Sequence, residues 1–189
     1  MKTLKFLALI GLLAIFAGVG AAVFFFGGFY SVAGTAEEPK IVSWALVQVR
    51  QASIARQAKE RPPMELNDAE LVKMGARAYG ERGCVNCHGA PGVEWAKFSE
   101  GLRPDPPDLK EVADEREPRE LFWVIKNGIN MTGMPSFAKI EVPDRELWTI
   151  VAFIKKLPTV KDEDYKAWTA PATPPAPPSP PAPGGTPPP

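Results

Sequence analysis

The hydrophobic pattern of the chain begins with one long uninterrupted run. From Phe6 to Tyr30 there are 25 consecutive residues without a charge. As a helix rising ~1.5 Å per residue they would reach roughly 37 Å, more than the ~30 Å hydrocarbon core of a bilayer. Lys2 and Lys5 precede the run and no basic residue follows until Lys40, so the positive-inside rule keeps the N-terminus in the cytoplasm and exports the remainder. We predict a membrane anchor over residues 1–36, with residues 6–30 spanning.

A cleaved signal peptide is the alternative for this segment. The apolar region of a signal peptide has only ~7–15 residues, which this run exceeds. Gly34-Thr35-Ala36 is nevertheless a passable small-x-small cleavage site, so the alternative stays open.

The next segment, residues 37–66, is predicted to be a juxtamembrane helix and linker. Between Lys40 and Arg61 there is no Gly or Pro, and apolar residues recur at roughly helical spacing until Pro62-Pro63 ends the helix. Beyond Lys40, its basic residues are Arg50, Arg56, Lys59 and Arg61. They have two interpretations: contacts with lipid phosphates or a partner, or a solvated face on a stalk.

Three further segments carry apolar residues at i, i+3/i+4 spacing and predict helices. The first opens at Asn67, which with Glu70 resembles a capping box, and runs to about Arg82, where Gly83 stops it. The second opens at Glu117-Pro118 and the third at Pro143-Asp144, ending at Pro158. No stretch alternates convincingly with period two. The pattern therefore predicts an all-α domain over residues 67–158, whose proline-heavy loop from Gly89 to about Arg116 must be ordered by something it wraps.

The composition of the chain excludes some classes of function. The 22 Lys+Arg balance the 22 Asp+Glu, so the chain lacks the excess of basic residues that is typical of nucleic-acid binding. Many of the 22 prolines crowd toward the end of the chain, so residues 159–189 are predicted to be a Pro/Ala-rich disordered tail. No general base, nucleophile or phosphate loop stands out, so we expect neither a small-molecule substrate nor an enzyme.

The informative chemistry lies in five adjacent residues. Cys84-Val85-Asn86-Cys87-His88 is C-x-x-C-H, the attachment motif for one covalent c-type haem. Two thiols one helical turn apart add to the two vinyl groups of a porphyrin, and the histidine supplies an axial iron ligand. A zinc site would need a fourth ligand, for which only a carboxylate remains, and a thioredoxin-like pair normally lies beside a βαβ pattern that is not seen here.

The second axial ligand cannot be histidine, because His88 is the only one. That leaves methionine or an open site among common haem ligands. Met134, between Gly133 and Pro135, is our assignment, and Met131 is the competitor. The predicted cofactor-binding residues are thus Cys84, Cys87, His88 and Met134, with His88 and Met134 on the metal.

These motifs resemble the class I cytochromes c, specifically the bacterial membrane-anchored mono-haem kind. The resemblance covers about residues 67–158 and rests on C-V-N-C-H, on G-I-N-M-T-G-M-P-S-F at 128–137 and on the last helix E-L-W-T-I-V-A-F-I-K-K-L. It implies a cytochrome c-like three-helix domain around a covalent haem, preceded by a transmembrane helix. It also implies that a proline carbonyl accepts the ring N–H of the ligand histidine, without deciding among Pro104, Pro106 and Pro107. The residues that it implies at the crossing of the first and last helices are Gly75, Tyr79, Trp148 and Phe153.

Histidine and methionine together saturate an iron, which describes an electron carrier. Trp95, Arg103 and Trp123 are candidates for binding the haem propionates. We expect a single-pass protein of the bacterial inner membrane, with its C-terminal domain in the periplasm, carrying single electrons between redox protein partners of the respiratory chain. The alternatives are a permanent electron-transfer subunit of a larger oxidoreductase complex and a haem-based gas sensor.

Overall fold

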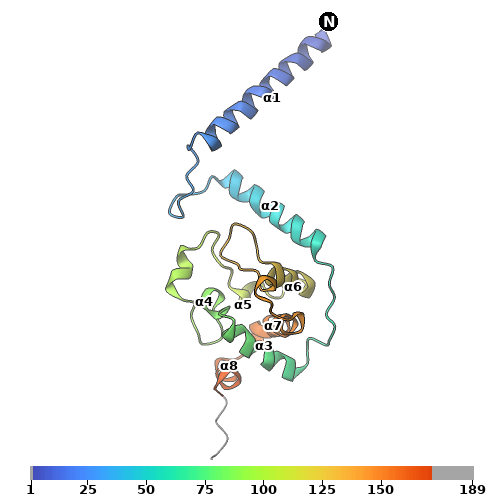
Figure 1. Cartoon of the computed structure of the whole chain (residues 1–189), viewed down its shortest axis with the longest axis vertical. Coiled ribbons are helices and arrows are strands. Elements are labelled where there is room, and N and C mark those ends of the chain that lie inside the picture. Colours follow the sequence, from blue (N-terminus) through green and yellow to red (C-terminus); the bar gives the residue numbers. More distant parts are fainter. Residues whose placement is uncertain (1, 172–189) are drawn as a thin grey trace, which may run out of the picture.

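The computed structural model describes residues 2–171, and this part of the chain is helical without a β-strand (Figure 1). The prediction of an all-α fold is therefore confirmed. The α-helices are α1 (Lys2–Phe26), α2 (Lys40–Gln57), α3 (Ala69–Glu81), α4 (Val85–His88), α5 (Leu109–Val112), α6 (Pro118–Asn127), α7 (Asp144–Lys156) and α8 (Asp162–Thr169). Short 3-10 helices occupy Lys97–Gly101, Ala138–Ile140 and Leu157–Thr159.

Helix α1 stands apart from the rest of the chain, and none of its residues is buried (Figure 1). By length and composition it is apolar enough to cross a membrane. This fits either a single-pass anchor or a signal sequence. The helix ends at Phe26, four residues before the end of the predicted span at Tyr30, because Gly28 has φ 79° and breaks the helical path.

Helix α2 lies along the edge of the domain, in contact with α6 (Figure 1). It ends at Gln57, well before Pro62-Pro63, because Ala58 turns to extended backbone with ψ 90°. Ala58 is only 1% exposed, so the chain leaves the helix against the domain. Helix α2 therefore packs on the domain that follows it and is not a free stalk, although Arg56, Lys59 and Arg61 are exposed, as expected of a solvated face.

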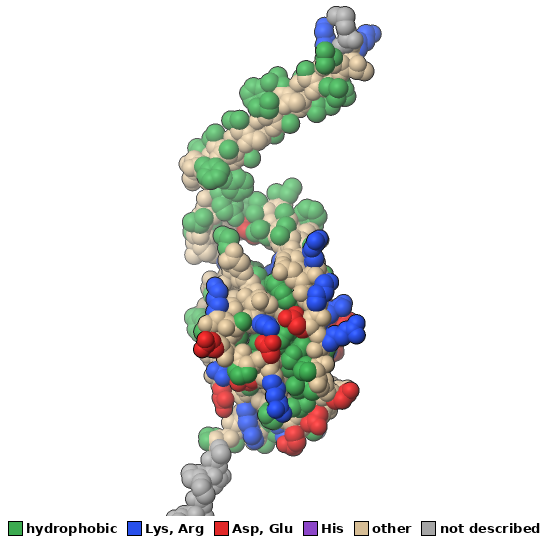
Figure 2. All heavy atoms as spheres, turned by 45° about the vertical axis from the view of Figure 1, so that its right-hand side comes forward, with side chains coloured by type: hydrophobic (Ala, Val, Ile, Leu, Met, Phe, Trp, Pro, Cys, Tyr) green, Lys and Arg blue, Asp and Glu red, His purple; other side chains and the backbone are tan. Residues whose placement is uncertain are grey.

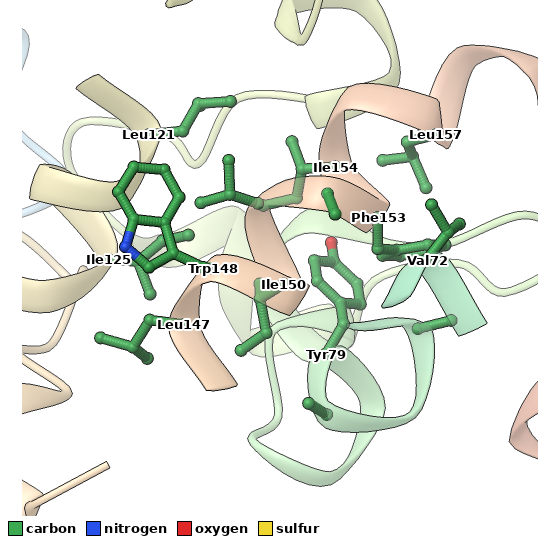
Figure 3. Packing of buried hydrophobic residues seen from close by; sticks show 14 of the residues in the cluster. Val72, Tyr79, Leu121, Ile125, Leu147, Trp148, Ile150, Phe153, Ile154 and Leu157 are labelled. Atoms are coloured by element: carbon green, nitrogen blue, oxygen red, sulfur yellow. The ribbon is translucent and has the colours of Figure 1, made fainter. Parts of the chain in front are cut away.

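The core forms where α3 crosses α7, the most extensive helix contact in the described chain (Figure 3). A Cβ at Gly75 would collide with the carbonyl oxygen of Thr149 and lie 2.9 Å from Phe153 Cβ. Next to this contact, the rings of Tyr79 and Phe153 meet edge to face at 5.2 Å. Helix α6 packs against α7 as well, and the ring of its Phe122 stacks on that of Trp148 with centroids 4.1 Å apart.

The cap of α3 is one residue later than predicted. Asp68, not Asn67, is the N-cap, and its Oδ1 accepts hydrogen bonds from the backbone N–H groups of Glu70 at 2.9 Å and Leu71 at 3.0 Å. A carboxylate also suits the positive end of a helix better than an amide does. The prediction of Asn67 as the N-cap is therefore wrong by one position.

The prediction of a disordered tail over residues 159–189 is wrong for its first part. Residues 162–169 form α8, whose Tyr165 is 5% exposed and stacks on Phe153 with ring centroids 5.6 Å apart. Arg77 of α3 donates to the carbonyl of Trp168 at 2.6 Å. Aromatic burial thus orders this segment, while the part of the tail prediction that concerns 172–189 lies outside the described residues.

We predict that Gly75→Ala destabilises the full chain by about 3 kcal/mol, because the added methyl group meets backbone that cannot move aside. Gly80→Ala in the same helix is the control, since a Cβ there meets only the Tyr165 hydroxyl, at 3.4 Å. Thermal unfolding followed by circular dichroism measures both. Equal midpoints for Gly75→Ala and the wild type would contradict the close crossing.

Candidate haem site

One cavity of about 440 Å³ brings together all four predicted site residues: Cys84, Cys87, His88 and Met134. This volume is within the ~300–1,000 Å³ of typical cofactor sites. The wall is largely apolar and includes Leu109, Leu121 and Ile154 among its residues. Two thiols, an imidazole and a thioether in an apolar cavity are the donor types of a covalently bound haem.

The two thiols lie on the tight turn that follows α3. Gly83, with φ 78°, ends that helix, and the N–H of Cys84 donates back to the carbonyl of Tyr79 at 3.1 Å. The N–H of His88 in turn donates to the carbonyl of Cys84 at 3.0 Å, which makes α4 a single turn. Burial raises the pKa of the Cys84 thiol to about 12, so this sulfur is protonated at neutral pH.

The imidazole of His88 is oriented by a proline carbonyl. His88 Nδ1 lies 2.8 Å from the carbonyl oxygen of Pro107. Because a carbonyl only accepts, Nδ1 carries the proton, and Nε2 keeps the free lone pair that a metal needs. Burial lowers the pKa of His88, which favours this neutral form. Among the three prolines that the sequence left open, the structure selects Pro107.

Met134 lies on the loop that follows α6, and hydrogen bonds within this loop hold it in place. The Met134 N–H donates to Thr132 Oγ1 at 3.1 Å, and the Thr132 hydroxyl donates to the Ile129 carbonyl at 2.8 Å. Gly128 has φ 69°, and a Cβ there would lie 2.8 Å from the carbonyl oxygen of Met134. This glycine therefore lets the loop fold back closely on the end of α6.

The structure separates the two methionines that the sequence put in competition. Met131 is 92% exposed and has φ 59°, so its side chain lies at the surface. Met134 is half-buried and lines the cavity.

The three residues suggested for haem propionates do not line the cavity. Arg103 forms an ion pair with Asp105 instead, and neither Trp95 nor Trp123 lines it. The arginines that do line it are Arg50, Arg82 and Arg116. Sequence reasoning noted Arg50 only as a basic residue of the juxtamembrane segment, because spacing alone does not show which face of α2 meets the domain.

The helical domain, with a C-x-x-C-H turn and a methionine loop facing the same cavity, is that of a class I c-type cytochrome. Residues 54–154, more than half of the chain, match the family model described as "Cytochrome C oxidase, cbb3-type, subunit III". The chain therefore belongs to this family of c-type cytochrome domains, which implies haem and electron transfer. Comparison with curated proteins and with solved structures gives no match.

Proposed function

We propose that this protein is a membrane-tethered mono-haem cytochrome c that carries single electrons between respiratory partners on the periplasmic face of a bacterial inner membrane. The observation that carries the proposal is the meeting of Cys84, Cys87, His88 and Met134 in one cavity. The apolar helix α1, preceded by the basic Lys2 and Lys5, supports the tether and its orientation.

In this proposal Cys84 and Cys87 would hold the haem through their sulfur atoms, and His88 and Met134 would bind its iron. A haem so bound would supply one-electron chemistry. The Pro107 carbonyl fixes the tautomer and plane of His88 through the 2.8 Å hydrogen bond. The largely apolar wall would surround the haem, and methionine ligation would raise its reduction potential.

The residues around the site favour electron transfer over reaction with a small molecule. Two protein ligands leave no free iron position, which disfavours the gas-sensor alternative. Lysine and arginine side chains intermingle with acidic ones over the domain surface (Figure 2). Such a mixed surface suits the small, transient contacts of redox partners.

Covalent attachment is tested with the double variant Cys84→Ala/Cys87→Ala. Acid–acetone treatment should leave haem on the wild-type chain and extract all haem from the variant, because only the variant lacks both thiols. The absorption of the two protein fractions after extraction measures this. Covalent haem on the double variant would refute the attachment.

The sulfur ligand is tested by comparing Met134→Ala with Met131→Ala. The charge-transfer band between sulfur and iron in the oxidised protein should vanish in Met134→Ala and persist in Met131→Ala, because only Met134 lines the cavity. Absorption spectra of both full-length variants measure the band. Its loss in Met131→Ala alone would reverse the assignment.

A permanent subunit of a larger oxidoreductase complex is the second candidate, and the outer face of α2 favours it. Ile41, Trp44 and Val49 lie on this face, and all are more than 60% exposed. The residues of α2 that face the domain are spaced along the opposite side of the helix. Large exposed apolar side chains that lie near one another are typical of a protein contact.

Mild detergent extraction followed by native sizing separates the two candidates. A lone carrier should migrate with no other polypeptide, because transient contacts do not survive dilution. Stoichiometric co-migration of other redox subunits would favour the permanent subunit. Trp44→Ser serves as a variant, since it should release such subunits while leaving the haem spectrum unchanged.

A further inference from the structure

Helix α2 is a wall of the haem cavity. Arg50, Gln51 and Ile54 of α2 line the same cavity as Cys84, His88 and Met134. Among the half-buried positions of α2, Ser43, Val47, Arg50 and Ile54 recur at intervals of three and four residues, so these four lie on one face of the helix.

Some of the charged side chains that line the cavity have ion-pair partners, and others have none among the described residues. Arg82 Nε lies 2.7 Å from Glu146, and Asp105 is paired with Arg103. Arg116 is exposed. Arg50 is half-buried and has no ion-pair partner among the described residues, and Glu120 of α6, which also lines the cavity, is not within ion-pair distance of it. A guanidinium that is partly removed from water on an apolar cavity wall is stabilised by a nearby anion.

We propose that Arg50 binds a propionate carboxylate of the haem, so that α2 closes the haem site and is held there by its cofactor. This inference rests on the proposed haem binding. A c-type haem brings two carboxylates into the cavity, and a guanidinium is the side chain best suited to pair with a carboxylate away from water. Ile54, one turn further along α2, covers the apolar part of the same opening.

A neighbouring segment holds α2 in the position that this contact requires. Glu60, three residues beyond the helix, lies 3.6 Å from Lys126 of α6, and Lys126 also pairs with Asp144 of α7 at 2.8 Å. The chain directly after α2 is thus joined to α6 by an ion pair. Arg50 lies about two helical turns before the end of α2, at the position where this helix lines the cavity.

The proposal predicts an effect on the reduction potential, because a positive charge beside the haem favours the reduced, less positive iron. In Arg50→Met, which keeps most of the aliphatic bulk, the ratio of reduced to oxidised protein at a fixed potential should fall about tenfold. For a one-electron couple this corresponds to about 59 mV. Arg50→Lys should retain most of the wild-type potential because it keeps the charge.

The measurement is a redox titration of the full-length, haem-loaded protein in detergent. Arg56→Met is the matched control, since Arg56 is on the same helix but is exposed and does not line the cavity. It should leave the potential unchanged. An unchanged potential in Arg50→Met overturns the proposal, and so does an equal fall in Arg50→Lys, which would assign the effect to packing.

Phenylglyoxal modification of the wild-type protein gives a test that needs no variant. Arg50 should react more slowly than Arg56 in the haem-loaded protein, because a carboxylate and the cavity wall shield it. Peptide mass spectrometry measures both rates, and equal rates would contradict the contact. Wild-type protein without covalent haem would instead refute the proposed function, so the two failures are distinguishable.

Discussion

The close crossing of α3 over α7 is the contact on which the site depends. It requires a residue without a side chain at Gly75, because the backbone of Thr149 occupies the space of a Cβ. Helix α3 ends at Glu81, so the turn that carries both thiols begins directly from this crossing. The Tyr79 hydroxyl donates to the Gly89 carbonyl at 2.8 Å and ties the far end of that turn to the same helix. The position of the thiols therefore follows from helix packing.

The opposite wall of the cavity is built on the same helix α7. The Trp148 ring of α7 stacks on Phe122 of α6, and α6 carries the methionine loop at its end. Lys155, also of α7, donates to the carbonyls of Ala113 at 2.6 Å and Arg116 at 3.1 Å, which fixes the segment before α6. Helix α7 thus packs both against α3, which precedes the C-x-x-C-H turn, and against α6, which precedes the Met134 loop.

The sequence predicted those parts of the fold and site that depend on local chemistry. Proline at the first turn of α6 and the C-x-x-C-H spacing have local physical reasons and could be read directly. The ordering of α8 depends on Tyr165 meeting Phe153, and the choice of Pro107 depends on how a loop wraps. The role of Arg50 likewise depends on which side of α2 meets α6. Such contacts join distant parts of the chain, and residue spacing contains no information about them.

The docking of α2 changes the length of the tether. Only residues 27–39 separate α1 from α2. Fully extended at ~3.3–3.6 Å per residue, these thirteen positions reach roughly 45 Å. If α2 were a free stalk, its 18 helical residues and the segment up to α3 would add to the reach of the tether. In the proposed membrane-tethered protein, the haem domain and α2 therefore diffuse as one body within a thin layer above the lipid, which concentrates it near partners embedded in the same membrane.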